Sequence, residues 1–137
     1  MKNKKIAVLM GGVSEERAIS LRSGEAVVRA LSSRECEVLP VDIQTETGSE
    51  LHTLQCDVAF IALHGRFGED GTSQRLLEKK GIPFTGSGAS SSQIAMDKIE
   101  SKKKLERVGI KTPSHAIISH EDGKEEWGRW AHSLGYP

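Results

Sequence analysis

The chain has 137 residues, of which 36% are hydrophobic, and its 19 Lys and Arg side chains balance 19 Asp and Glu side chains. This length suits one domain, or one domain and the beginning of another, with enough apolar residues for a buried core. Nucleic acids and anionic membranes attract a surplus of positive charge, so the net charge of zero argues against both as partners.

The N-terminus and the cysteines indicate where the protein resides. Ile6–Met10 is an apolar run too short for a signal peptide or a membrane span, and two glutamates soon follow it. Cys36 and Cys56 lie far apart and lack the spacing of a metal or redox motif, which is typical of small hydrophobic residues in a reducing compartment. The sequence therefore predicts a cytoplasmic protein.

Four short apolar runs in the first 86 residues are typical of buried strands, and helical patterns separate them. The expected strands are Ile6–Met10, Cys36–Asp42, Val58–Leu63 and Ile82–Gly86. The expected helices run from a capping Ser14 to about Ser33, weakly over Ser49–Leu54, and over Thr72–Gly81. This alternation predicts an α/β fold with an open parallel sheet and helices on both faces.

The composition changes after Gly86, which predicts a second structural unit. A small polar segment, Gly86–Gln93, precedes a basic helix over Met96–Gly109. Ser114–His120 has strand character, and Glu125–Pro137 is typical of a short helix with two tryptophans on one side. We expect one domain over residues 1–95 and the beginning of a second, truncated domain over residues 96–137.

Two loops carry unusual residues: "GGVSEER" (Gly11–Arg17) and "HGRFGEDG" (His64–Gly71). In an open parallel sheet, ligands bind beyond the carboxyl ends of the strands, where the strand order reverses. With the strand order 2-1-3-4, both loops would leave strands that flank this reversal. We therefore expect the two loops to form the walls of a small-molecule site.

The first loop favours a cationic ligand group over a phosphate. Gly11 and Gly12 follow a strand, but the third glycine of a dinucleotide motif and the Lys-Ser/Thr pair of a P-loop are missing. Glu15 and Glu16 would repel a phosphate, whereas a carboxylate suits an ammonium group. Alternatively, both glutamates only complement the helix dipole, which contributes about 0.3–1 kcal/mol each.

The second loop offers a histidine and two acids. The imidazole of His64 could hydrogen-bond a substrate carboxylate or carry positive charge near one, unless a neighbouring backbone group satisfies it. Glu69 and Asp70 could act as partners of His64 or Arg66, although capping of the next helix is the favoured role. The other histidines lack Cys or carboxylate partners at ligand spacing, so we expect no metal site.

Lys98 begins the basic helix, and three more lysines follow it one turn later. A run of lysines is usually a solvated helix face. Lys98 differs because it closely follows the Gly/Ser-rich segment, from which its ammonium group could reach a phosphate.

The chain resembles the N-terminal part of the D-alanine–D-alanine ligase family in three ordered stretches: "KIAVLMGGVSEERAISLRSGEAV", "DVAFIALHGRFGEDGTSQRLLEKKGIPFTGSG" and "AMDKIESKKKLERVGIKTP". The resemblance implies a Rossmann-like (pre-ATP-grasp) domain followed by the start of an ATP-grasp domain. It also implies a cytoplasmic enzyme that joins two D-alanines for peptidoglycan synthesis, using ATP and Mg²⁺, and homodimerisation through the N-terminal domain.

The resemblance implies roles for individual residues. Glu16 is expected to hold the ammonium group of the first D-alanine, and His64 to lie beside the reacting carboxylate, so both are catalytic candidates. Glu69 joins them as a substrate-binding candidate, and Lys98 matches the lysine that reaches ATP. Three positions depart from the usual family residues without removing an implied ligand: Ala18, Ser73 and Arg75.

The family's Gly/Ser-rich loop over the ATP phosphates and its Mg²⁺ carboxylates have no counterpart in these 137 residues. We therefore expect that the chain alone does not ligate D-alanine. Two other functions stay open. One is a stand-alone binding or regulatory Rossmann-like domain without catalysis, and the other is a flavodoxin-like nucleotide-binding module, against which the missing phosphate motif counts.

Overall fold

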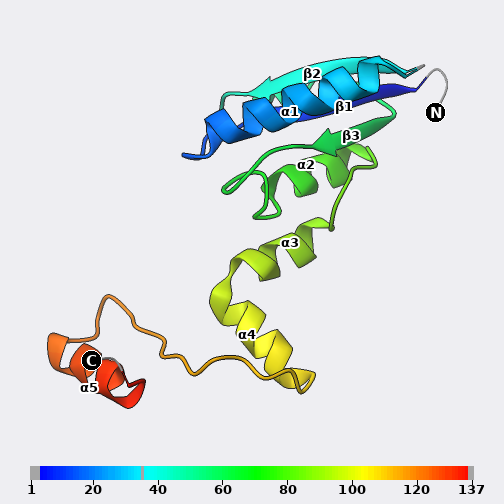
Figure 1. Cartoon of the computed structure of the whole chain (residues 1–137). Coiled ribbons are helices and arrows are strands. Elements are labelled where there is room, and N and C mark those ends of the chain that lie inside the picture. The colour runs from blue at the N-terminus through cyan, green and yellow to red at the C-terminus, as the bar shows by residue number, and fades with distance from the viewer. Residues whose placement is uncertain (1–3, 35, 136–137) are drawn as a thin grey trace. The chain divides into compact units, whose positions relative to one another are not determined.

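The structure is a computed structural model that describes residues 4–34 and 36–135. The chain divides into two compact units, Met1–Met96 and Asp97–Pro137, whose strands and α-helices are labelled in Figure 1. The first unit comprises β1 (Lys5–Gly11), α1 (Arg17–Ser32), β2 (Glu37–Ile43), the 3-10 helix η1 (Ser49–Leu51), β3 (Val58–Ile61), α2 (Thr72–Lys80) and α3 (Ala89–Met96). The second unit comprises α4 (Lys98–Arg107) and α5 (Lys124–Ser133).

The first unit is built on a parallel sheet of three strands in the order β2-β1-β3. The central strand, β1, is buried from Ile6 to Gly11. Its register sets Ile6 opposite Val38 on one side and opposite Val58 on the other. The predicted α/β class with a parallel sheet is therefore confirmed, with strand limits within two residues of those expected.

The fourth expected strand is wrong. Ile82–Gly86 contributes only one bridge, between Ala59 and Phe84. The next ladder bond is replaced by a side chain, because the Ile61 N–H donates to the Thr85 hydroxyl at 3.1 Å. The alternation of strands and helices predicted the position of this segment, but not the side chain that ends its pairing.

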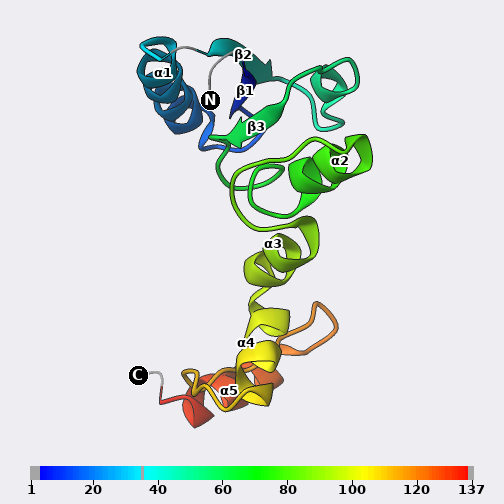
Figure 2. The ribbon, with the colours of Figure 1, turned by 90° about the vertical axis from the view of Figure 1, so that its right-hand side faces the viewer.

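Helices cover both faces of the sheet, as Figure 2 shows for α1 on one side and α2 on the other. On the α2 side, Leu9 belongs to a hydrophobic cluster with Leu51 and Leu77. On the other side, Met10 meets Gly24 of α1. Because successive strand residues point to opposite faces, the single apolar run of β1 serves both layers.

The first helix begins two residues later than expected. Ser14 does not cap it, because the Ser14 hydroxyl donates to the His64 carbonyl at 2.9 Å and accepts from the Glu16 N–H at 3.2 Å. Glu16 occupies the N-cap position, and its side chain makes no capping bond. Glu15 and Glu16 therefore precede the first turn of α1, where the sequence had suggested that they lie within it.

Two later segments also differ from expectation. The second half of the polar segment Gly86–Gln93 belongs to helix α3, which begins at Ala89. Ser92 is buried in this helix, and its hydroxyl donates to the Ser87 carbonyl at 3.3 Å. Ser114–His120 forms no strand, since the described residues of the second unit offer no neighbouring strand with which it could pair.

The second unit consists of two helices joined by an irregular segment. Asp97 caps α4, since its carboxylate accepts from the N–H groups of Ile99 and Glu100 at 2.9 and 3.0 Å. On α5, Trp127 and Trp130 are 45% and 41% exposed, and none of the described residues of this unit is buried. The expected end of this helix at Pro137 lies outside the described residues.

Within residues 4–34 and 36–135, every helix is too short or too polar to cross a membrane.

Gly24 sets the distance between α1 and the sheet. It is buried in the middle of the helix, and an added Cβ atom would overlap the Cβ of Met10. The Cβ of Met10 belongs to the central strand and cannot move aside as the end of a side chain could. Close packing of α1 therefore requires that residue 24 has no side chain.

We predict that Gly24→Ala lowers the free energy of unfolding by about 1–2 kcal/mol, because overpacking outweighs the roughly 1 kcal/mol that alanine gains in helix propensity. Chemical denaturation followed by circular dichroism measures this loss. Gly128→Ala is the matched control, since a Cβ atom at this other helical glycine meets nothing within 4 Å. A Gly24→Ala protein as stable as the parent would contradict the close packing of α1.

Candidate functional site

The loops that follow β1 and β3 meet at the carboxyl edge of the sheet, where the Ser14 hydroxyl bonds the His64 carbonyl. Gly65 packs so closely against the first loop that a Cβ atom there would come within 2.6 Å of the Glu16 carboxylate. Its φ of +64° is also one that favours glycine. The two loops that the sequence singled out are therefore in direct contact.

Three serines hold the chain segment that leaves β3. Besides the bond from Ser14, the buried Ser20 hydroxyl donates to the Ala62 carbonyl at 2.8 Å. Ser23 Oγ lies 3.4 Å from Nε2 of His64. Ser20 and Ser23 are three residues apart on α1 and so share one face of that helix. This face fixes both the backbone and the ring of the histidine segment.

The His64 imidazole lies between two side chains from different elements. Its Nε2 faces Ser23 of α1, and its Nδ1 lies 3.7 Å from Oε1 of Glu69. The side chains of His64 and Glu69 are 34% and 50% exposed, so solvent reaches both. The ring is thus oriented by side chains, and not by the neighbouring backbone group that the sequence left open as an alternative.

Asp70 fixes the shape of the same loop. Its carboxylate accepts from the backbone N–H groups of Phe67 and Thr72 at 3.0 and 2.9 Å. Burial by itself raises the pKa of Asp70, but these backbone hydrogen bonds outweigh it and lower the pKa below its usual value. Phe67 is buried and has a φ of +73°, a strained conformation for a non-glycine residue. Asp70 thus serves the loop and the start of α2, whereas Glu69 faces His64.

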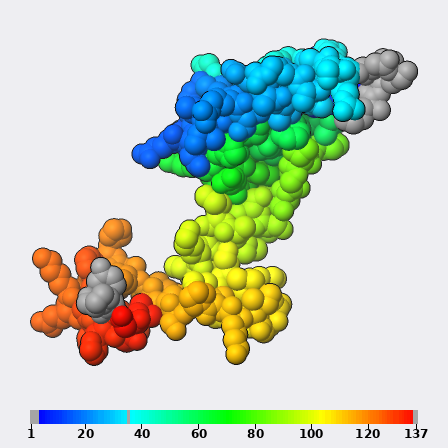
Figure 3. Space-filling model, viewed as in Figure 1, coloured from blue at the N-terminus to red at the C-terminus, as the bar shows by residue number. Residues whose placement is uncertain are grey.

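Two hollows open beside these loops. His64 and Glu69 line one of about 370 Å³, whose other walls come from residues 85–87 and from α3. Its base includes buried Gln74, whose side-chain amide donates to the Gly68 carbonyl at 2.6 Å. The second, of about 500 Å³, lies beside Gly12, Val13, Ser14, Arg17 and Gln44. Glu16 lines neither hollow and stays exposed on the loop between β1 and α1, which projects from the first unit in Figure 3.

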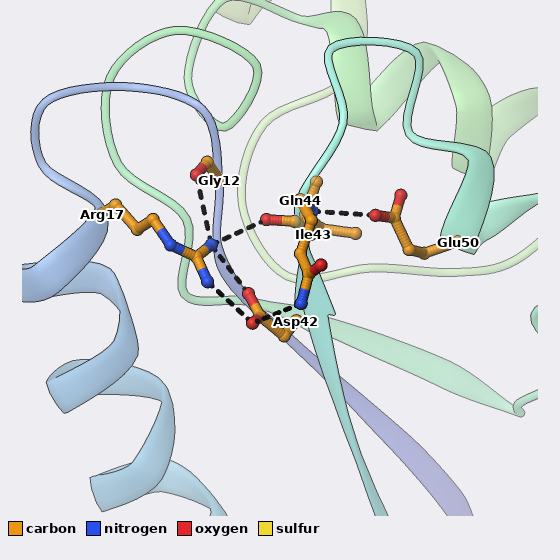
Figure 4. A network of polar contacts seen from close by, with 6 residues as sticks. All are labelled: Gly12, Arg17, Asp42, Ile43, Gln44 and Glu50. Carbon is orange, nitrogen blue, oxygen red and sulfur yellow. Dashed lines mark hydrogen bonds and ion pairs between the residues drawn. The ribbon is translucent and has the colours of Figure 1, made fainter.

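Arg17 ties the ends of β1 and β2 to the start of α1 (Figure 4). Its guanidinium group donates to both carboxylate oxygens of Asp42 at 2.8 Å. It also donates to the Ile43 carbonyl at 2.9 Å and to the Gly12 carbonyl at 3.3 Å. A two-pronged arginine–carboxylate pair fixes orientation as well as distance. This pair therefore sets where the first loop leaves the sheet.

The pair shifts the pKa of both of its members. The hydrogen bond from Arg17 lowers the pKa of Asp42 below its usual value, against the smaller opposing effect of burial. The same bond raises the pKa of Arg17, so the guanidinium group stays charged. A carboxyl group with a lowered folded-state pKa stabilises the protein above the pKa of the unfolded chain, and this stabilisation is lost as the pH falls through the folded-state value.

We predict that Asp42→Asn lowers the denaturation midpoint at neutral pH, because the ion pair is lost. The difference from the parent protein should shrink as the pH falls below the ordinary aspartate pKa of about 3.9, and should disappear once the pH lies below the lowered pKa of Asp42. Denaturant titrations across this pH range measure the difference. As a control, Glu37→Gln on the same strand removes the exposed pair with Lys5 and should change little. A difference that stays constant with pH would refute the ion pair.

Sequence reasoning placed Glu16, His64 and Glu69 on the two loops, and missed the residues that hold them. Arg17 and Asp42 were not singled out, and neither were the serines of α1. The sequence did contain a signal for the serines. Ser20, Ser23 and Gly24 are small residues at helical spacing, so they share one face of a helix whose predicted core-facing residues are apolar. Lys98 is the exposed first residue of α4 in the second unit, and its role stays a prediction.

Comparison with known proteins adds independent information. A family model described as the N-terminus of D-ala D-ala ligase matches residues 5–52 and 46–87. The D-alanine–D-alanine ligase of Syntrophotalea carbinolica is 52% identical over 118 residues, which cover 86% of this chain and 39% of the relative. The ligase of Geobacter sulfurreducens is 44% identical over 137 residues, with 100% and 42% covered.

Solved structures give the same result. The D-alanine–D-alanine ligase of Bacillus anthracis complexed with ATP matches with a TM-score of 0.80 at 38% identity, covering 92% of this chain and 44% of that one. VanG D-Ala:D-Ser ligase of Enterococcus faecalis matches with a TM-score of 0.76 at 25% identity, covering 96% and 49%. The chain spans about two fifths of the length of the two curated relatives described above. By family model, sequence identity and fold together, it belongs to the D-alanine–D-alanine ligase family.

Proposed function

We propose that this chain supplies the binding site for the first D-alanine of an ATP-dependent D-alanine–D-alanine ligase. The observation that carries the proposal is the Glu16 carboxylate, which is exposed on a loop packed against Gly65, the residue that follows His64. Among the residues that the structure describes, no side chain pairs with this carboxylate. It is therefore available for a ligand.

D-Alanine carries an ammonium group and a carboxylate on one carbon atom, and the two loops offer a group of complementary chemistry to each. The Glu16 carboxylate can accept hydrogen bonds from the ammonium group. The imidazole of His64 can donate a hydrogen bond to the carboxylate, and does so most strongly when it is protonated. Because Gly65 and Ser14 keep the loops together, a bound amino acid would be oriented at both ends.

The expected activity follows that of the family. ATP phosphorylates the carboxylate of the first D-alanine, and the amino group of a second D-alanine attacks the acyl phosphate. A relative whose structure was solved with ATP supports ATP as the phosphate donor. In this chain, Lys98 is the proposed ATP contact, from the start of an ATP-grasp domain over residues 96–137, and residues 1–95 are the proposed Rossmann-like substrate-binding domain. The parallel order β2-β1-β3 supports the latter assignment.

The same proposal includes a role in peptidoglycan synthesis, a cytoplasmic location and homodimerisation through the first domain. Mg²⁺ assists the reaction in the family. Within the described part of the chain, no three His, Cys, Asp or Glu side chains come together as a metal site, so we assign no metal ligand to these residues. What they contribute is the binding and orientation of the amino acid.

A chimera tests the function directly. In the ligase of Geobacter sulfurreducens, the first 42% of the chain would be replaced by this sequence, to which it is 44% identical. We predict that the chimera forms D-alanyl-D-alanine, and that Glu16→Gln lowers kcat/KM for D-alanine by about 10- to 100-fold, since one charge-assisted hydrogen bond is weakened. The assay follows dipeptide formation by chromatography together with ADP release.

The matched control is Glu15→Gln, because Glu15 is the neighbouring exposed glutamate on the same loop. This variant should retain most of the activity of the chimera. Equal losses in both variants would contradict a specific role for Glu16. A folded chimera that binds D-alanine without forming the dipeptide would favour the alternative of a binding domain without catalysis.

A further inference from the structure

The two ring nitrogens of His64 meet side chains of different hydrogen-bonding character. Oε1 of Glu69 lies 3.7 Å from Nδ1, and Oγ of Ser23 lies 3.4 Å from Nε2. We infer that Glu69 selects the neutral His64 tautomer that carries its hydrogen on Nδ1 and that Ser23 then donates to Nε2, which makes both side chains positioning residues of the site. The inference deepens the proposed function and rests on it for its relevance to D-alanine.

The assignment follows from what each partner can do. An ionised carboxylate only accepts hydrogen bonds, so a favourable contact with Glu69 requires a hydrogen on Nδ1. In neutral imidazole the other nitrogen, Nε2, then carries the lone pair. A serine hydroxyl can donate to an unprotonated nitrogen or accept from a protonated one, so Ser23 serves the tautomer that Glu69 favours and donates to Nε2. The opposite tautomer would direct the lone pair of Nδ1 at the carboxylate, which is electrostatically unfavourable.

Ser23 is held in place by the packing of α1. Its neighbour Gly24 allows α1 to approach the sheet, and Ser20, one turn earlier, bonds the Ala62 carbonyl. Ser23 itself is only partly exposed. The histidine cannot easily move away from the hydroxyl, because the His64 carbonyl is bonded by Ser14. Both partners of this contact are thus fixed by independent interactions.

One functional consequence follows for the histidine. With the hydrogen on Nδ1, on the side of Glu69, Nε2 is the single basic nitrogen of the neutral ring. Any proton that His64 takes up at the site must therefore arrive at Nε2, beside Ser23. The ring then becomes a cation with a donor on each nitrogen, the state that binds a carboxylate most strongly.

The test measures the ring nitrogens of the chain as it is, by nitrogen-15 NMR at about pH 8.5, where ordinary imidazoles are neutral. His64→Gln identifies the signals of His64 among those of the five histidines. We expect the parent protein to show a protonated Nδ1 and an unprotonated Nε2. In Glu69→Gln the ratio of the two tautomers should shift by about two- to fivefold toward the Nε2-protonated form, because an exposed charge that favours a hydrogen on Nδ1 is lost.

Two variants separate tautomer selection from a merely structural role. Glu69→Asp keeps a carboxylate and should stay closer to the parent ratio than Glu69→Gln, whose side chain can also donate. Ser23→Ala removes a hydroxyl that serves either tautomer and should change the ratio less than Glu69→Gln does. Because Glu69 is half exposed, its substitutions should leave the fold intact. Ser32→Ala, at an exposed serine of the same helix, is the control and should leave the ratio unchanged.

Two results would overturn the inference. One is a parent protein that carries its hydrogen mainly on Nε2, and the other is a Glu69→Gln variant that keeps the parent ratio. The measurement uses neither D-alanine nor ATP. A failure to bind D-alanine would therefore refute the proposed function and leave the tautomer result standing. An unexpected tautomer ratio would refute this inference and leave the proposed function standing.

Discussion

The guanidinium group of Arg17 joins the ends of β1 and β2 to the start of α1, and the first loop of the candidate site leaves from this junction. At this edge of the sheet, Arg17 donates to the carbonyls of Gly12 and Ile43 and binds a carboxylate at the same time. The Ile43 carbonyl also accepts from the Gly12 N–H at 2.9 Å. The two parallel hydrogen bonds of the pair fix its geometry. The pair also depends on the ionisation of Asp42, whose pKa it lowers.

Packing and hydrogen bonding act together on the second loop. Gly24 brings α1 close to β1, and only at that distance can Ser20 and Ser23 reach the segment that leaves β3. Serine hydroxyl groups donate to two carbonyl groups of this segment: Ser20 to Ala62 and Ser14 to His64. The same α1 face that contributes to the core therefore also orients the His64 ring, which couples the stability of the first unit to the geometry of its site.

Family membership and the site support different levels of conclusion. The family model, the relatives and the solved structures establish that the chain is a member of the D-alanine–D-alanine ligase family. The local geometry adds a reason why its residues suit an amino acid: an exposed carboxylate and an oriented imidazole lie on loops in direct contact. Lys98 belongs to the second unit, and its proposed ATP contact depends on the family resemblance alone.

The sequence by itself determined the parallel α/β class, the approximate strands, and the two loops that carry Glu16 and His64, because hydrophobic periodicity and glycine-rich breaks are local signals. Only the tertiary structure decided which side chains hold these loops. The contacts of Arg17 with Asp42, Ser20 with Ala62 and Ser23 with His64 join residues 25 to 42 positions apart. It also decided that Thr85 limits the expected fourth strand to one bridge and that Ser14 binds a distant carbonyl in place of capping a helix. A hydroxyl or a carboxylate has many partners of similar energy, and the packing of distant segments selects among them.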